Sequence, residues 1–216
     1  GDEGRDVLVA KGILHGDFTL LGPRSSAGDF FMGPAYYYMI TPFLWLFRYD
    51  PVGPAVMVAL LSVVTTWLVY FTGKQWFNAL AGLFAAALYA VSPLVIAYAH
   101  SSWNPDVLPF FALLLIYVSF RAVQEKNATK KFLIVGFLLG ISLQLHYLAL
   151  FLGFIVFVYT FAANWYIHHK PQWLVLVKQY LQIFFGFIFG ISPFLAFEFR
   201  HGFPNSKAIF TFIFSD

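Results

Sequence analysis

Long apolar runs separated by short polar connections dominate this chain. Six of the runs approach the roughly 20 residues that a helix needs to cross a bilayer. They occupy residues 52–72, 79–99, 106–123, 132–146, 149–166 and 180–199. The pattern therefore predicts an all-α, polytopic membrane protein with about six transmembrane helices.

The segment before the first span contains two weaker helical patterns. A shorter apolar run, residues 34–47, is bracketed by Pro34 and Pro42, which favours an interfacial or re-entrant helix. Upstream, apolar residues recur at helical spacing while Glu3 and Asp6 are expected on the opposite side, typical of an amphipathic surface helix. The apolar positions are Val7, Ala10, Ile13 and Leu14.

The same pattern divides the chain into three parts. Residues 1–50 are expected to form an external loop with amphipathic juxtamembrane helices, residues 51–199 the transmembrane domain, and residues 200–216 the start of a later external loop. Because the chain opens on Gly1 and stops just after a fresh apolar run at 209–214, we expect it to be truncated at both ends.

Composition agrees with a membrane setting and removes several classes of function. Of the 216 residues, 60% are hydrophobic and 11% charged, which exceeds what a soluble domain of this size can bury. The net charge of +3 comes from scattered residues, so no nucleic-acid partner is predicted. The absence of cysteine excludes disulfides and thiolate chemistry.

Lysine and arginine predict which loops face the cytoplasm. Connections 73–78, 121–131 and 167–179 carry all the basic residues found between spans, whereas 100–105 and 147–148 carry none. The positive-inside rule then places nine of the ten acids on the extracytoplasmic face of the cytoplasmic membrane. These are Asp2, Glu3, Asp6, Asp17, Asp29, Asp50, Asp106, Glu198 and Asp216.

Two groups of acids are candidates for catalysis. Asp2, Glu3 and Asp6 open the surface helix. Neighbouring carboxylates raise one another's pKa, and a carboxylate with a raised pKa can act as a base that takes a proton from an alcohol. Acids also favour the first turn of a helix for its dipole alone, which is the simpler explanation. Asp106 follows Asn104 and Pro105 at the mouth of a span, where it could either cap a helix or serve a substrate.

The remaining candidates are basic or aromatic residues on the same predicted face. Arg200 could bind a phosphate or carboxylate, or could pair with Glu198 close by in the sequence. His146 is of a residue type that is common at membrane interfaces, which is the simpler interpretation. The alternative is that it makes a polar contact to the substrate. The candidates for substrate binding are Arg200, Glu198, His201, His146, Arg24 and Asn104.

No motif for a phosphate loop, a nucleophile elbow or an HExxH zinc site occurs. The sequence therefore indicates no cofactor and no metal site, although a divalent ion would be compatible with the chemistry below.

The order of these features resembles the GT-C superfamily of polyprenyl-phosphate-sugar-dependent glycosyltransferases. An acidic pair opens a surface helix, a Gly-rich loop leads to G-P-x-Y-Y-Y at 33–38, S-P stands at 92–93, N-P-D at 104–106, and E-F-R-H-G-F-P-N at 198–205. Within that superfamily the chain looks like the protein O-mannosyltransferase-like (dolichyl-phosphate-mannose–protein mannosyltransferase) group, which includes the aminoarabinose–lipid A transferases.

The resemblance implies roles for individual residues. In the acidic pair Asp2-Glu3, Asp2 would be the base that activates the acceptor, and Asp106 would position the acceptor or support the base. Arg200 would hold the donor phosphate. The lysine that the family usually carries before the proline-rich turn is absent, since Gly33 precedes Pro34. A second lysine is replaced by Gln144 or His146, so Arg24 is a further candidate for the phosphate.

Together these patterns predict an inverting membrane glycosyltransferase. Its partners would be a polyprenyl-phosphate-linked sugar, an acceptor protein, lipid or glycan, and the surrounding membrane lipids. The alternative is a transporter or flippase, which usually carries ionisable residues near mid-bilayer and repeated halves; neither is evident here. A non-enzymatic membrane scaffold is the third reading.

Overall fold

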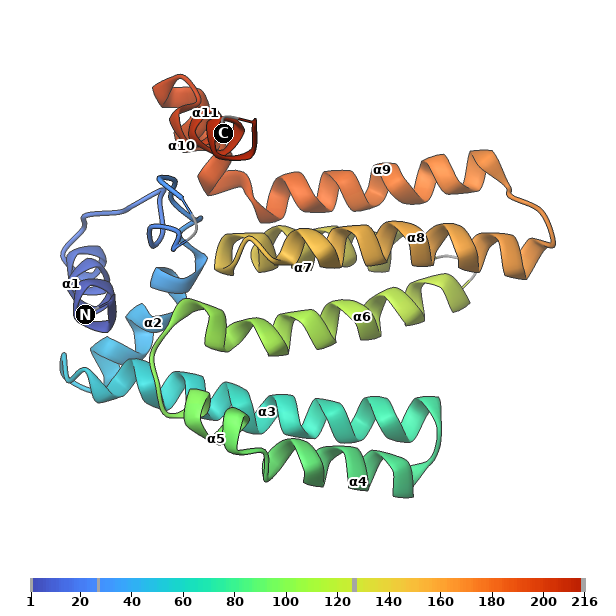
Figure 1. Cartoon of the computed structure of the whole chain (residues 1–216), viewed down its shortest axis with the longest axis horizontal. Coiled ribbons are helices and arrows are strands. Elements are labelled where there is room, and N and C mark those ends of the chain that lie inside the picture. Colours follow the sequence, from blue (N-terminus) through green and yellow to red (C-terminus); the bar gives the residue numbers. More distant parts are fainter. Residues whose placement is uncertain (1, 27, 126–127, 215–216) are drawn as a thin grey trace.

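Helices make up most of the computed structural model, which describes residues 2–26, 28–125 and 128–214 (Figure 1). Within those residues no strand forms, apart from an isolated antiparallel bridge between Arg24 and Phe31. The helices are α1 (Asp2–Leu14), α2 (Ala35–Leu46), α3 (Val52–Trp76), α4 (Ala79–Ala90), α5 (Pro93–Ala99), η1 (Asn104–Val107), α6 (Leu108–Gln124), α7 (Thr129–Leu145), α8 (Ala149–His168), α9 (Trp173–Gly190), α10 (Ser192–His201) and α11 (Pro204–Phe214). The predicted charges at Lys126 and Asp216 fall outside the described residues.

The all-α polytopic membrane fold is confirmed. Among the described residues, four helical segments are long and apolar enough to cross a bilayer, and they lie side by side in Figure 1. They are α3, the η1–α6 unit, α8 and α9. The predicted span at 132–146 forms α7, which has 17 residues and packs against α6, α8 and α9.

The predicted span at 79–99 is not a single straight helix. It divides into α4 and α5, which meet at an angle of 62°. Helix α4 ends at Ala90 with Val91 as its C-cap, and Ser92 is the N-cap of α5. Pro93 lies in the first turn of α5, where a backbone N–H would have no partner within the helix. If the bent pair crosses as one unit, the described part of the chain contains five candidate spans.

The bounds predicted for the last span were also wrong. Helix α9 begins at Trp173 and ends at Gly190, seven residues earlier than expected at its start and nine earlier at its end. Pro171 restricts the start, and Pro193 begins a separate helix, α10, after Ile191. Residues 192–199 thus belong to α10.

The two ends of the bundle are built differently: one carries short turns and the other carries additional helices (Figure 1). The turns 77–78 and 169–172 lie at one end, together with the end of α6 and the start of α7, so the three connections predicted to be cytoplasmic share this end. Helices α1, α2, η1, α10 and α11 gather at the opposite end. The fold therefore brings the N-terminal acids and the later 198–205 segment to the same end of the molecule.

Helices α7 and α9 approach unusually closely because glycines face each other along their contact. A Cβ added to Gly136 would lie 1.9 Å from the Ile183 carbonyl oxygen, and one added to Gly186 would lie 2.0 Å from that of Leu133. Gly140 and Gly190 extend both rows by one turn. This is the small-xxx-small pattern by which membrane helices bring their backbones together.

Candidate functional site

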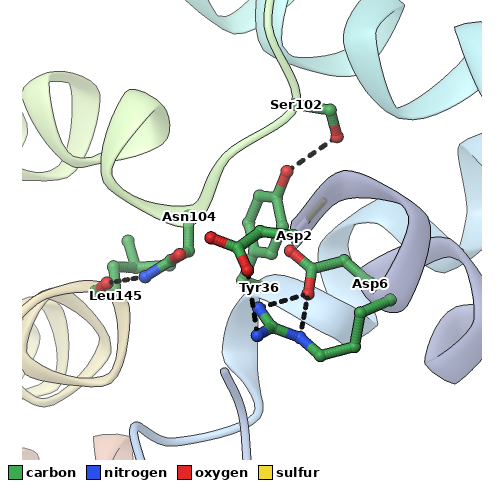
Figure 2. A network of polar contacts seen from close by, with 7 residues as sticks. Asp2, Asp6, Tyr36, Ser102, Asn104 and Leu145 are labelled. Carbon is green, nitrogen blue, oxygen red and sulfur yellow. Dashed lines mark hydrogen bonds and ion pairs between the residues drawn. The ribbon is translucent and has the colours of Figure 1, made fainter. Parts of the chain in front are cut away.

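The first turn of α1 carries an Asp–Arg–Asp ion-pair chain. The Arg5 Nη1 atom lies 3.2 Å from Asp2 Oδ1, while Arg5 Nε and Nη2 donate to Asp6 Oδ1 at 3.1 and 3.0 Å. The Asp2 side chain is 62% exposed, but that of Asp6 is fully buried. Dashed lines in Figure 2 join the Asp2 and Asp6 carboxylates to the same guanidinium.

Asp6 lies on the buried face of α1, not on the polar side expected for it. The buried residues of α1 are Asp6, Ala10 and Ile13. Ala10 and Ile13 belong to the same hydrophobic core as Tyr36 and Tyr37 of α2. Burial raises the pKa of Asp6, and the hydrogen bond and charge of Arg5 partly offset that effect. Burial, followed by the Asp6 charge, raises the pKa of Tyr37 to about 12.

Glu3 connects α1 to the loop between α5 and η1. Its Oε1 accepts a hydrogen bond from the Ser102 backbone N–H at 2.9 Å. The Ser102 hydroxyl in turn lies 2.8 Å from the Tyr36 hydroxyl (Figure 2). Three segments, α1, α2 and the 100–103 loop, are therefore fixed to one another through these side chains.

Asp106 occupies the single turn η1 at the mouth of α6. Its Oδ2 accepts a hydrogen bond from the Ser101 hydroxyl. It also lines a cavity of about 340 Å³ that contains His146, Trp103 and Tyr98, with Ser62 of α3 in the wall. This volume is at the lower limit of small-molecule sites.

Asn104 and Gln144 fix the framework behind these acids. The Asn104 amide donates to the Leu145 carbonyl at 2.5 Å (Figure 2). Gln144 Nε2 donates to the Gly190 carbonyl at 2.5 Å, and its Oε1 accepts from the Ala35 N–H at 3.2 Å. Gly33 packs on the Gln144 side chain so closely that an added Cβ would lie 2.3 Å from it.

His146 lies in the wall of the cavity beside Asp106. Its Nδ1 is 3.2 Å from the Leu148 N–H, which donates to it, and its ring stacks on Tyr147 with centroids 4.3 Å apart. Burial lowers the pKa of His146. This favours the neutral imidazole at neutral pH.

Glu198 is buried and caps helix α11. Its two oxygens accept from the backbone N–H groups of Asn205 and Ser206 at 3.1 and 2.8 Å, and from the side chains of the same residues. Burial acts to raise the pKa of Glu198, but these hydrogen bonds outweigh it and lower the pKa. Glu198 therefore pairs with the start of α11 and not with Arg200.

Replacing Glu198 with alanine should loosen the α10–α11 hairpin, because four donors lose their acceptor. Since the folded-state pKa is lowered, the carboxylate stabilises the hairpin above the ordinary value of about 4.3, and that contribution is lost as pH falls through the folded value. Hydrogen exchange of residues 198–206 should therefore rise in Glu198→Ala. Glu198→Gln should exchange faster than the parent at neutral pH and converge with it in acid; equal exchange at both pH values would contradict this.

The other basic candidates are exposed. Arg200 is exposed on α10. His201 Nδ1 is 2.9 Å from the Phe197 carbonyl oxygen, and its ring stacks on Phe197 at 4.1 Å. Arg24 forms an ion pair with Asp29 at 2.7 Å. None of these three forms an ion pair with Asp2, Glu3 or Asp106 within the described part of the chain.

Glu3, Asp6 and Asp106 are linked to the buried hydroxyl of Tyr36 in different ways. Glu3 accepts from the N–H of Ser102, whose hydroxyl contacts that of Tyr36; Asp106 accepts from the adjacent Ser101; and Asp6 is buried where α1 packs on α2. Burial raises the pKa of Tyr36, and the charges of those three acids raise it further. Asp2 joins the group through Arg5. Across the described ranges, no three His, Asp or Glu side chains are arranged to hold a metal ion.

Sequence reasoning missed Arg5, Tyr36 and Ser102 as members of this group. The signal for Arg5 was available, since it lies three residues after Asp2 and one before Asp6. No local signal exists for Ser102, because its contact with Glu3 joins residues 99 positions apart.

Comparison with known proteins gives one positive result. A family model described as dolichyl-phosphate-mannose-protein mannosyltransferase matches residues 32–197, which is most of the chain. The match includes Asn104, Asp106 and His146. No curated protein and no solved structure shows a significant match.

Proposed function

Because the chain belongs to the dolichyl-phosphate-mannose-protein mannosyltransferase family, we propose that it transfers a sugar from a polyprenyl phosphate to an acceptor hydroxyl. The acceptor would be a protein, a lipid or a glycan of the cell envelope. Transfer would take place on the non-cytoplasmic face of the cytoplasmic membrane and would invert the anomeric centre.

The observation that most supports this proposal is the cluster of acids at one end of the bundle. The charges of Glu3, Asp6 and Asp106 act on one buried hydroxyl, that of Tyr36, and Arg5 ties Asp2 to Asp6. The end of α3, which carries Lys74, and the start of α7, which carries Lys130 and Lys131, lie at the other end (Figure 1). A lipid-linked donor keeps its phosphate at the membrane surface, where such a cluster can reach it.

Asp2 is the best placed of these acids to act as the base. Its side chain is 62% exposed, whereas Asp6 is buried and Glu3 accepts from Ser102. Asp2 would take the proton of the acceptor hydroxyl as the acceptor oxygen bonds to the anomeric carbon. The bond between that carbon and the phosphate oxygen breaks, and polyprenyl phosphate leaves with the electron pair.

Asp106 and its cavity would hold the acceptor or the sugar beside that base. The cavity of about 340 Å³ presents a carboxylate, an imidazole and aromatic rings, which suit the hydroxyls and the apolar face of a sugar. Arg200 or Arg24 would bind the departing phosphate by charge-assisted hydrogen bonds. Positioning two substrates in this way supplies much of the rate of a transferase.

The test is transfer by the full-length protein in vesicles, with a radiolabelled polyprenyl-phosphate sugar and acceptor peptides, lipids and glycans. We expect labelled product of inverted anomeric configuration, and none from the corresponding nucleotide sugar. Movement of the intact lipid-linked sugar across the bilayer, without transfer, would instead support the flippase alternative.

A further inference from the structure

We propose that Asp6 and Arg5 are positioning residues that hold the Asp2 carboxylate in place for catalysis. Buried Asp6 fixes the Arg5 guanidinium, and Arg5 in turn fixes Asp2. The inference rests on the proposed role of Asp2 as the base, and it adds two residues that act through Asp2 without touching the substrate.

The arrangement of the hydrogen bonds carries the argument. Arg5 directs both Nε and Nη2 to a single oxygen of Asp6, Oδ1, at 3.1 and 3.0 Å. Asp6 Oδ2 is buried and accepts no hydrogen bond of full geometry among the described residues, although the Tyr37 hydroxyl lies close enough to the Asp6 carboxylate to lower its pKa. A side-on guanidinium pairing normally serves both carboxylate oxygens. Nη1, which takes no part in that side-on pairing, is directed to Asp2 at 3.2 Å.

This geometry is poorly explained by stability alone. Burial removes the solvation of the Asp6 carboxylate, and its Oδ2 gains no hydrogen bond from Arg5 in return. An apolar pair at the same positions would serve the contact of α1 with Tyr36 and Tyr37 of α2 as well. What the Asp6–Arg5 pair adds is a fixed cation facing Asp2.

The ion-pair chain formed by Asp2, Arg5 and Asp6 runs from the surface of the protein to its interior. Exposure of the side chains falls from 62% at Asp2 to 41% at Arg5 and to zero at Asp6. The rigid end is therefore the buried one, packed on α2, and the free end is the carboxylate that an acceptor can reach. Glu3 fixes the same turn of α1 to the Ser102 backbone, so the main chain around Asp2 is also held.

The experiment measures kcat and KM for donor and acceptor in full-length Asp6→Asn, Arg5→Lys and Arg5→Gln, reconstituted in vesicles. We expect kcat to fall by up to about 100-fold in Asp6→Asn and Arg5→Gln, the scale of a base misplaced by about 1 Å, with both KM values within about two-fold of the parent. Arg5→Lys should have an intermediate kcat, since lysine keeps the positive charge but lacks the planar guanidinium that binds Asp2 and Asp6 at the same time. Asp17→Asn removes a carboxylate from the exposed segment after α1 and should leave both constants unchanged.

The double variant Arg5→Gln/Asp6→Asn should be no slower than Arg5→Gln, because Asp6 acts only through Arg5. Multiplicative losses would overturn the proposal, and so would a raised donor KM with unchanged kcat, which would make Arg5 a donor ligand. If Asp6→Asn does not fold, the Arg5→Lys and Arg5→Gln pair still decides the matter. Unaltered kcat in these variants beside an inactive Asp2→Asn would remove only this inference, whereas an active Asp2→Asn would remove the base itself.

Discussion

Replacing Asp2 with asparagine should slow sugar transfer by about 100- to 10,000-fold, the range that a general base contributes. Asparagine keeps the size of the side chain and can still accept from Arg5, but it cannot take a proton. The exposed position of Asp2 predicts little effect on folding. The loss should therefore appear in kcat, while membrane insertion and the KM for donor stay close to those of the parent.

The measurement is initial transfer rate per amount of inserted protein. Asp17→Asn is a suitable control, because it also removes an exposed carboxylate near α1, and its rate should match the parent. Asp2→Glu should keep part of the activity, since the carboxylate is retained but lies one methylene group farther from the main chain. Full activity in Asp2→Asn would exclude Asp2 and direct attention to Asp106, which lines the neighbouring cavity.

The membrane fold was predictable because each span is encoded in its own run of residues. Helices α3, α6 and α8 begin and end within a few residues of the predicted apolar runs. The start of α9 was predicted seven residues too late. The other errors occur at Ser92-Pro93 and Ser192-Pro193, where an apolar run continues through a proline. Hydropathy does not detect such breaks, since both sides are equally apolar, whereas the missing proline N–H ends the helix.

The site was predictable only where its contacts are local. The acids at the start of α1 were identified, and Arg5 could have been, because all lie within one turn and a half of helix. The face of Asp6 was predicted incorrectly, since polarity alone argues for exposure, and its burial depends on the pairing with Arg5 and the packing of α2. The link from Glu3 to Ser102 arises from tertiary structure.

The second large effect concerns the contact between α7 and α9. In Gly186→Ala the new Cβ would lie 2.0 Å from the Leu133 carbonyl oxygen and 3.0 Å from the Phe137 nitrogen. Both are backbone atoms, so no side chain can rotate away and the helices must separate. Overpacking of this kind destabilises by about 1–3 kcal/mol or more, which exceeds the gain of about 1 kcal/mol that alanine brings within a helix.

Gly153→Ala in α8 provides the matched control, because its Cβ would meet only Leu139 at 3.6 Å, an ordinary contact. Its unfolding midpoint in detergent should equal or exceed that of the parent, whereas that of Gly186→Ala should fall. Activity should fall with it, since Gln144 joins the outer end of this helix pair to Ala35, one residue before Tyr36 of the acid cluster. An unchanged midpoint in Gly186→Ala would mean that α7 and α9 lie farther apart than their glycines require, and the framework behind Asp106 would then have to be held by other contacts.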